Sequence, residues 1–535
     1  MEGGSTKWWQ TGIIYQVYPR SFQDSNRDGV GDLQGIIHRL PYLVELGVDA
    51  IWLSPIFASP MADFGYDIAD YIDVDPLFGN LADLDSLINS AHRHRLKVIL
   101  DLVPNHTSDQ HPWFLDSKAS RNNPKREWFI WRDPAPGGDP PNNWLSEFGG
   151  SAWELDKNTD QYYYHTFLTA QPDLNWRNPA VRHAIHDVMR FWLRRGVDGF
   201  RVDAVWYLFK DDRFRNNPLN HDFRPGGLPR DALIPLYTAD LPEVHGAISG
   251  MRRVVDEFPD RVLLGEIYLP IERLVAYYGR ELDGLHFPYN FALLTAKWDA
   301  RSLAALIEEY EAALPAGGWP NWVLGNHDRP RLATRIGLDQ ARVAAMLLMT
   351  LRGTPTLYYG DEIGMQQVTI SPEQVRDPFE KNVPGIGIGR DGCRTPMQWD
   401  ATRFAGFSDV RPWLPVADHY CEENVETFSK DQNSLYWLYR RLIGFRRRRA
   451  ALTEGSYKLL RASGDLLLFC RERGDERLLI ALNMGSQAIS VSFPDEGSGR
   501  ILLSSFADRE MEEVRASIDL RSSEGLLVLV DSMKK

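Results

Sequence analysis

The sequence predicts an α/β protein built on a (β/α)8 TIM barrel, with an irregular subdomain inserted after the third strand and an antiparallel β-domain at the C-terminus. Three observations lead to this prediction. Short apolar segments alternate with longer amphipathic segments along the first two thirds of the chain. A long segment rich in Pro, Gly, Asn and Trp, residues 105–175, interrupts this alternation. Beyond residue 455 the strand-like segments follow one another without helices.

Eight segments have the apolar composition of buried strands. They are residues 13–18, 50–54, 97–103, 199–205, 261–267, 285–289, 322–324 and 356–359. Strands that alternate with helices pair in parallel, because each crossover helix returns the chain to the same end of the sheet. Eight such units predict a closed barrel. An open doubly wound sheet is the alternative, but no Gly-rich phosphate-binding turn follows the first strand.

Helices are expected between these strands and at the end of the barrel. In residues 33–46, Ile36, Leu40 and Leu43 recur at the three- and four-residue spacing of one helical face. Further helices are predicted at residues 81–95, 180–195 and 433–449. After the last helix the predicted strands are residues 466–469, 478–482, 489–493, 501–504 and 526–530.

Two segments are too long to be simple strand-to-helix loops, namely residues 105–175 and residues 208–244. Both follow the C-terminal end of a predicted strand, which is where barrel enzymes place their active sites. The predicted division of the chain is therefore a barrel in residues 1–104 and 176–454, an inserted subdomain in residues 105–175 and a C-terminal β-sandwich in residues 455–535.

The overall charge is acidic, with 60 Lys and Arg against 73 Asp and Glu and a net charge of −13. This argues against nucleic acid as a partner, because phosphate contacts need basic side chains. No apolar stretch suits a membrane span, no signal peptide is visible, and the three cysteines lack disulfide or metal spacing. We expect a cytoplasmic monomer or homodimer without a membrane partner. The 17 Trp, 21 Tyr and 24 Phe suit a neutral polyhydroxyl ligand.

Polar residues stand where predicted strands end, and this is the main functional signal. They lie within the segments 63–67, 101–106, 201–203, 265–266 and 325–328. In a closed barrel the C-terminal strand ends converge on one site, so these residues would meet. Each acid taken alone is better explained as a helix cap or a surface ion pair, but five such strand ends favour a common site.

Three acids at one site cannot all ionise freely, so at least one pKa should be raised. This division suits glycosidic cleavage, in which a protonated acid serves the leaving oxygen and an ionised carboxylate faces the anomeric carbon. Arg201 lies two residues before Asp203, so both side chains point to the same side of a strand. The guanidinium would hold Asp203 ionised and in position.

Four segments resemble the conserved regions of the α-amylase family, glycoside hydrolase family 13. They are DLVPNH at 101–106, GFRVDA at 199–204, LGE at 264–266 and GNHD at 325–328. Residues 15–22, 64–67 and 394–399 further resemble the α-glucosidase / oligo-1,6-glucosidase branch. The resemblance covers nearly the whole chain. It implies the same arrangement of barrel, insertion and C-terminal β-domain.

By this resemblance Asp203 is the nucleophile, Glu266 the general acid/base and Asp328 the transition-state stabiliser. The family retains anomeric configuration, which implies carboxyl groups about 5–5.5 Å apart and a covalent glucosyl-enzyme. Water or another acceptor hydroxyl then takes the glucosyl group. The resemblance thus implies a retaining exo-acting α-glucosidase that also transfers glucosyl units to alcohol or sugar acceptors.

The resemblance also implies a set of substrate-binding residues around one glucosyl unit. His106 and His327 would bind its hydroxyls, and Tyr66 would stack under the ring. Asp63 and Arg394 would form the pair that closes the non-reducing end of the pocket. The full set implied is Asp63, Tyr66, His106, Arg201, Ala204, His327 and Arg394.

Ala204 follows the nucleophile and bears on linkage preference. In the resembling branch, Val at this position accompanies α-1,6 preference, and a smaller Ala or Thr accompanies α-1,4. A β-branched side chain would narrow the subsite that binds the leaving group. Ala204 therefore predicts a preference for maltose-type α-1,4 substrates.

The segment 24–32 carries oxygen side chains at alternate positions and a Gly in the turn, like the first part of an EF-hand loop. In the resembling branch this loop holds a structural Ca2+ or Mg2+. The implied ligands are Asp24, Asn26, Asp28, the Val30 carbonyl and Asp32. The alternative is an Asx-rich turn without metal. No organic cofactor is expected.

Several other activities compete with this prediction. Within the class they are an oligo-1,6-glucosidase, a sucrose-active glucosidase, a predominantly transferring α-glucosyltransferase and a phosphoglucosidase, which would need basic residues near the leaving group. A candidate from another class is a non-catalytic transporter partner. Such a protein would lack the catalytic acids and carry a membrane span, whereas this sequence has the acids and shows no such span.

Overall fold

The computed structural model describes residues 6–386, 389–492 and 498–531. Its centre is an eight-stranded parallel sheet with the strand order β11-β10-β9-β5-β2-β1-β13-β12. The strands are β1 (Ile14–Val17), β2 (Ala50–Leu53), β5 (Lys97–Leu102), β9 (Gly199–Val202), β10 (Val262–Ile267), β11 (Phe287–Asn290), β12 (Asn321–Val323) and β13 (Thr354–Tyr358). Each of the eight predicted strands overlaps one of these, so the predicted fold class is confirmed.

The first and last strands of this order, β11 and β12, are joined through a side chain. The Asn321 amide oxygen accepts a hydrogen bond from the Asn290 backbone N–H at 2.9 Å, and its amide nitrogen donates to the Pro288 carbonyl. The side chain of one buried asparagine therefore makes the hydrogen bonds that join β11 to β12, in place of backbone-to-backbone bonds between these two strands.

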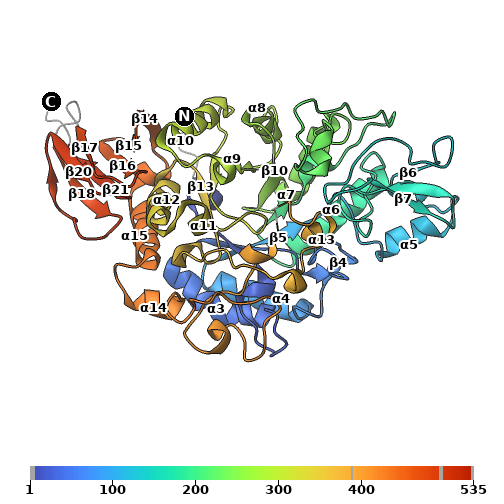
Figure 1. Cartoon of the computed structure of the whole chain (residues 1–535), viewed down its shortest axis with the longest axis horizontal. Coiled ribbons are helices and arrows are strands. Elements are labelled where there is room, and N and C mark those ends of the chain that lie inside the picture. Colours follow the sequence, from blue (N-terminus) through green and yellow to red (C-terminus); the bar gives the residue numbers. More distant parts are fainter. Residues whose placement is uncertain (1–5, 387–388, 493–497, 532–535) are drawn as a thin grey trace.

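Helices alternate with the strands and surround the barrel (Figure 1). The principal ones are α3 (Leu33–Leu46), α4 (Leu81–Arg93), α6 (Pro179–Arg194), α7 (Glu243–Asp256), α10 (Ala300–Ala313), α12 (Leu338–Thr350) and α15 (Leu435–Arg448). The side chains of Asp32, Asn80 and Asp299 accept backbone N–H groups at the start of their helices. Helix α3 ends at Gly47, whose φ of 99° is a left-handed cap conformation.

Shorter helices fill the connections between these elements. They are α1 (Trp8–Thr11), α2 (Pro19–Phe22), α5 (Pro112–Ala119), α8 (Ile271–Leu274), α9 (Ala292–Thr295), α11 (Leu332–Ile336), α13 (Pro378–Asn382), α14 (Val425–Lys430) and α16 (Ala450–Thr453). Among the described residues, no helix is both long and apolar enough to cross a membrane.

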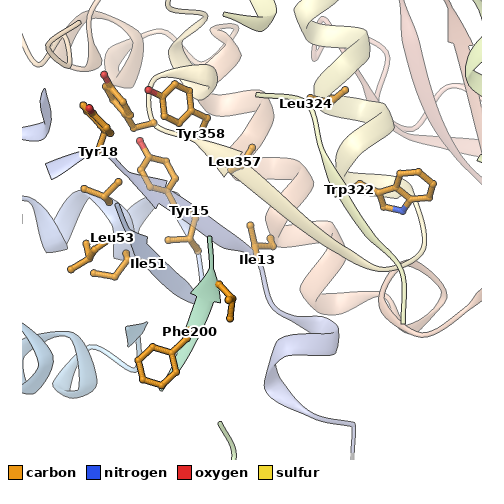
Figure 2. Close-up of a cluster of buried hydrophobic side chains, with 14 of the residues drawn as sticks. Ile13, Tyr15, Tyr18, Ile51, Leu53, Phe200, Trp322, Leu324, Leu357 and Tyr358 are labelled. Carbon is orange, nitrogen blue, oxygen red and sulfur yellow. The ribbon is translucent and has the colours of Figure 1, made fainter. Parts of the chain in front are cut away.

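Strand alternation separates an apolar outer face of the barrel from a mixed inner face. Tyr15, Leu53, Phe200 and Leu357 belong to the large buried cluster between strands and helices, part of which Figure 2 shows. Neighbouring residues such as Ile14, Trp52, Ile99 and Leu264 belong to a separate cluster inside the barrel. Because side chains alternate with period two, Gln16, Asp101, Arg201 and Glu266 also point inward. The site residues thus share the barrel interior with its apolar core.

The first insertion forms a small antiparallel sheet with the order β6-β8-β7, from β6 (Trp131–Arg132), β7 (Trp153–Asp156) and β8 (Gln161–Tyr164). A further pair, β3 (Phe57–Ala58) and β4 (Asp70–Val74), lies between β2 and α4. The first insertion contacts the second one directly. The Trp144 indole donates to the Arg215 carbonyl at 2.8 Å, and Asn143 and Asn217 exchange two hydrogen bonds.

The C-terminal sheet is antiparallel and lies at the opposite end of the molecule from β6 and β7 (Figure 1). Its order is β14-β15-β16-β21-β18-β19, and β17 pairs with β20 separately. The bounds are β14 (Ser456–Ser463), β15 (Leu466–Arg473), β16 (Glu476–Asn483), β17 (Ile489–Ser492), β18 (Gly499–Ser504), β19 (Glu513–Val514), β20 (Ser517–Leu520) and β21 (Gly525–Val530). All five predicted strands occur, although Phe493 lies outside the described residues. The sequence did not predict β14, β19 or β20.

Candidate active site

A cavity of about 370 Å³ lies at the C-terminal ends of the barrel strands. Eight of the ten predicted catalytic and substrate-binding residues line it, namely Asp63, Tyr66, His106, Asp203, Ala204, Glu266, His327 and Asp328. The other two, Arg201 and Arg394, are fully buried behind these residues. The barrel therefore gathers residues that are spread along most of the chain, as expected of strand ends that converge.

One guanidinium connects the acids at the floor of the cavity. The Arg201 Nη1 lies 2.8 Å from Oδ1 of Asp203 and 2.8 Å from Oδ1 of Asp101. Its Nη2 lies 2.9 Å from Oε2 of Glu266. Arg201 is 1% exposed, so this cation faces three carboxyl groups in a setting from which water is largely excluded.

The two proposed reacting carboxyls oppose each other's ionisation. Burial raises the pKa of Asp203 well above its usual range, and the charge of Glu266 raises it further. Burial likewise raises the pKa of Glu266, against the attraction of Arg201. The Ala204 backbone N–H donates to Oε2 of Glu266 at 2.9 Å. Such a pair favours one shared proton, which suits one acid and one carboxylate.

Asp328 behaves in the opposite way. Burial disfavours its ionisation, but the neighbouring His327, Arg394 and Arg390 outweigh burial and hold its pKa well below the usual range. The Arg394 Nη2 lies 2.9 Å from Oδ1 of Asp328. Asp328 is therefore a permanent anion at the edge of the cavity, suited to stabilise positive charge that develops on a sugar ring.

Tyr66 and His327 form a stacked pair, with ring centroids 5.5 Å apart and an interplanar angle of 2°. The Gln16 amide nitrogen lies 2.8 Å from Nδ1 of His327. An amide N–H can only donate, so the ring proton resides on Nε2, which lies 2.7 Å from the Tyr66 hydroxyl. That hydroxyl in turn donates to Oδ2 of Asp101 at 3.1 Å. Burial lowers the pKa of His327 to about 3, so the ring is a neutral donor.

The structure corrects one predicted pair. Arg390, and not Arg394, binds Asp63, with Nη2 at 2.8 Å from Oδ1. Arg390 also makes a two-pronged contact with Asp377 and approaches Oδ1 of Asp328 at 3.4 Å. Arg394 instead donates to the His327 carbonyl at 2.8 Å. Both arginines flank the short turn Asp391–Cys393, and only the fold decides which of them reaches Asp63.

Sequence reasoning missed several residues of the cavity. Besides Arg390, the wall includes Glu147 from the first insertion and Arg230 from the second, which form an ion pair across the two insertions. Tyr268 carries the Arg329 guanidinium over its ring at 5.5 Å. These residues lie outside the resembling motifs. Glu147 and Arg230 belong to the insertions, which have no strand-end pattern. Tyr268 and Arg329 directly follow the predicted strand 261–267 and the segment 325–328, and that position is the signal that could have marked them.

The predicted metal loop is closed by its own hydrogen bonds. Oδ1 of Asp24 accepts the backbone N–H groups of Asn26 and Arg27, and Oδ1 of Asp28 accepts that of Val30. Asp32 caps helix α3 through the Gly35 N–H. The side-chain donors are oxygens, which is the chemistry that hard cations require. In the part of the chain that the structure describes, no three acidic, His or Cys side chains gather closely enough to hold a metal.

Comparisons with known proteins agree with this geometry. The model of the "Alpha amylase, catalytic domain" family matches residues 16–455. The chain is 43% identical to a "Probable alpha-glucosidase" of Rhizobium meliloti over 91% of each chain. It is 38% identical to an "Oligo-1,6-glucosidase" of Heyndrickxia coagulans, covering 94% of this chain and 96% of the relative.

A solved structure extends the likeness to three dimensions. An "alpha-glucosyl transfer enzyme" superposes with a TM-score of 0.93 at 39% identity, covering 98% of this chain and all of the other. The span that the family model matches contains the barrel from Gln16 of β1 onward, the first insertion and every acid at the cavity floor. The chain therefore belongs to the α-amylase family, glycoside hydrolase family 13, within its α-glucosidase / oligo-1,6-glucosidase branch.

Proposed function

We propose that the protein is a retaining exo-α-glucosidase that removes single glucosyl units from the non-reducing ends of short α-glucosides. The observation that carries this proposal is the Arg201 guanidinium, which joins Asp203 and Glu266 at the floor of one cavity. This contact holds two carboxyl groups close to one buried cation, and retaining hydrolysis needs such a closely spaced pair, one as nucleophile and one as acid.

In the first step Glu266 donates its proton to the glycosidic oxygen while Asp203 attacks C1. The C1–O bond breaks, the leaving alcohol departs, and Asp203 forms a β-glucosyl ester. In the second step the ionised Glu266 takes a proton from water, whose oxygen attacks C1 and displaces Asp203. The product is α-glucose, and both carboxyl groups return to their starting protonation states. Asp328 and the neutral His327 would stabilise the charged transition states.

The exo mode follows from the pair Asp63–Arg390, which lies at the cavity beside Tyr66 and His106. A chain that continued beyond the non-reducing glucose would have to displace this buried ion pair, which is costly. The pair therefore limits the donor side to one glucosyl unit. The methyl side chain of Ala204 at the cavity wall supports a preference for α-1,4 linkages.

Two alternatives share this site. The relatives include an oligo-1,6-glucosidase and an alpha-glucosyl transfer enzyme, so α-1,6 cleavage and transfer to alcohol or sugar acceptors are the next candidates. A phosphorylated substrate is less favoured. Arg230 is already neutralised by Glu147, which leaves Arg329 as the cavity arginine without a carboxylate contact among the described residues.

We also propose that the loop from Asp24 to Asp32 binds a structural Ca2+ or Mg2+, with Asn26, Asp28 and the Val30 carbonyl as further ligands. The support is the alternating series of oxygen donors, with Asp24 and Asp32 buried. The loop lies apart from the residues that line the cavity, so a cation there would stabilise the fold.

A cytoplasmic location of the protein stays a prediction.

Product analysis tests the main proposal. Incubation with maltose, isomaltose, sucrose and trehalose, with and without an alcohol acceptor, should release α-glucose from maltose fastest, and 1H NMR should show the α-anomer before mutarotation. An Asp203→Asn variant should lower kcat by a factor of at least about 10⁴. Initial release of β-glucose, or parent-like rates for the Asn variant, would overturn the proposal.

A further inference from the structure

One side of the cavity has an apolar wall that the proposed mechanism does not use. Asp63 and Arg390 close the donor side, so a leaving group or an acceptor must lie on the remaining side. Residues of both insertions, of the short helix η2 (Val205–Tyr207) after the nucleophile, and of the segment after Glu266 line that side. We call it the acceptor half and define it by Leu145, Trp206, Tyr207, Leu233, Pro235 and Tyr268.

Leu145 and Leu233 are the residues of this wall that the packing of the protein does not explain. Both are half-buried, and each comes from a different insertion. In the described part of the chain, neither leucine belongs to a buried hydrophobic cluster or packs against one. A single apolar side chain at the surface needs no explanation, but here two of them line the same concave site. An apolar ligand would remove this surface from water, which is favourable.

Aromatic rings extend the apolar wall. The ring centroid of Trp206 lies 4.7 Å from that of Tyr207 and 5.9 Å from that of Tyr268. Tyr268 in turn stacks on Phe291 with centroids 4.5 Å apart. The Arg329 guanidinium lies 5.5 Å from the Tyr268 ring centroid, and guanidinium groups bind the faces of aromatic rings. The acceptor half therefore offers contacts that suit an aromatic ligand.

The polar side chains around this wall are bonded to one another. The Glu147 carboxylate accepts hydrogen bonds from Arg230 and from the Tyr207 hydroxyl. The Asn217 amide nitrogen donates to Oγ1 of Thr238 at 3.1 Å, and the Asn217 oxygen accepts a backbone N–H at 2.9 Å. A sugar in the acceptor half would thus find few free partners for its hydroxyls, and a buried hydroxyl without a partner is costly.

We propose that the acceptor half binds an apolar ring, so that the protein transfers glucosyl units preferentially to alcohols that carry an aromatic ring. The proposal deepens the function proposed above and rests on it, because it uses the same glucosyl-enzyme. In the transfer step the alcohol oxygen attacks C1 and the ester bond to Asp203 breaks, while the ionised Glu266 takes the hydroxyl proton. The product is the α-glucoside of the alcohol, and both carboxyl groups return to their starting protonation states.

Competition between an acceptor and water tests this preference. The donor is α-glucosyl fluoride, because fluoride leaves no sugar in the acceptor half. The acceptors are benzyl alcohol, ethanol as a primary alcohol without a ring, and methyl β-glucoside, which offers sugar hydroxyls but no α-glucosidic bond. The ratio of transfer product to free glucose, divided by the acceptor concentration, reports the fate of one common intermediate. It does not depend on the total activity.

In the parent protein this ratio should be at least about tenfold higher for benzyl alcohol than for ethanol, as expected when a phenyl ring is removed from water. It should also be higher for benzyl alcohol than for methyl β-glucoside. This comparison needs no variant, so it stands even if a substitution impairs folding.

Leu145→Asn and Leu233→Asn test the residues of the wall. Neither change removes a contact with a buried cluster, so both variants should fold, which a melting curve checks. Each should lower the benzyl alcohol ratio by at least about threefold and keep the ethanol ratio. Leu115→Asn and Leu236→Asn are the matched controls, because these leucines are exposed on the same two insertions and lie outside the cavity.

A parent protein that transfers to benzyl alcohol no better than to ethanol, or better to methyl β-glucoside, would overturn the proposal. Folded variants of Leu145 and Leu233 that both keep the parent ratio would do the same. Failure of the proposed function looks different. In that case no acceptor mixture yields glucose from the fluoride, or the first glucose released is the β-anomer, and the inference fails with the function.

Discussion

The guanidinium of Arg390 lies 2.8 Å from the Asp63 carboxylate and closes one side of the cavity. The two residues are 327 positions apart in the chain. Burial raises the pKa of Asp63, and the charge of Arg390 opposes that rise. Arg390 favours the charged form of Asp63 more strongly than Arg394 does, so this buried pair is sensitive to single substitutions at Arg390.

Arg390→Ala should weaken substrate binding more than it slows the chemical step. The change leaves Asp63 and Asp377 without their shared cation, and truncating one partner of a buried charge pair lowers kcat/KM by about 30-fold or more. Steady-state kinetics with maltose should show this loss mainly as a raised KM. Lys381→Ala, an exposed cation on the same segment, is the matched control. An unchanged KM in Arg390→Ala would show that Arg390 does not contribute to substrate binding.

Ala204→Val should change both stability and linkage preference. Ala204 has φ of 44° and ψ of 36°, a left-handed conformation that β-branched residues adopt at a cost of about 1–3 kcal/mol. Denaturant unfolding should show that cost, and the ratio of maltose to isomaltose activity should fall. Ala204→Gly, which relieves the strain and keeps the space, should preserve the ratio. The same ratio in Ala204→Val as in the parent would refute the linkage prediction.

The pH dependence of stability should report Asp361, a buried acid outside the cavity. Burial raises its pKa to about 7, and the nearest Arg331 nitrogen is 4.0 Å away. The unfolded value is about 3.9, so the folded protein binds this proton more tightly. The contribution of this proton to the free energy of unfolding is therefore fully present below pH about 4 and is lost as the pH rises through about 7.

Asp361→Asn removes this titration. Between about pH 5 and 8 the parent should lose more unfolding free energy than the variant, with a slope of up to about 1.4 kcal/mol per pH unit. Asp339→Asn changes the same charge at an exposed position and is the control. Parallel stability curves for the parent and Asp361→Asn would show that Asp361 does not titrate in this range.

Chelation tests the proposed cation at the loop from Asp24 to Asp32. EDTA should lower the melting temperature of the parent, because an ion that binds the folded state stabilises it, and added Ca2+ should restore it. Activity at 25 °C, far from the melting transition, should change little. Asp28→Ala should melt lower and no longer respond to EDTA, whereas Asp139→Ala should behave like the parent. A parent that melts at the same temperature with and without EDTA would leave the loop as a hydrogen-bonded turn.

The strand pattern of the barrel could be predicted because each strand is a short, mostly apolar segment that stands between turn-forming residues. Residues 97–103, for example, were predicted as a strand from this composition, and the observed strand β5 spans Lys97–Leu102. Strand β14 was missed for the opposite reason. Its residues are half-exposed, so its sequence, including Lys458 and Arg461, lacks an apolar signature. Edge strands of this kind are held by their neighbour in the sheet and not by their own composition.

The residues of the site likewise fall into those that the sequence could identify and those that it could not. Asp203, Glu266 and Asp328 could be identified because each stands at a strand end and within a segment that resembles a conserved region of the α-amylase family. Arg390 and Glu147 could not, because they lie in long connections whose path depends on what they pack against. The wrong assignment of Arg394 to Asp63 has this origin, because both arginines belong to one loop and the carboxylates that they bind come from remote segments of the chain.

The sequence by itself determined the barrel, the order of its elements and the identity of the acids, because hydrophobic periodicity and strand-end residues are local properties. The tertiary structure alone decided which arginine meets Asp63, which nitrogen of His327 carries the proton and how Arg201 divides its bonds among three carboxyl groups. These relationships are contacts between distant segments in a buried setting, where charge and hydrogen-bond geometry depend on every neighbour at once.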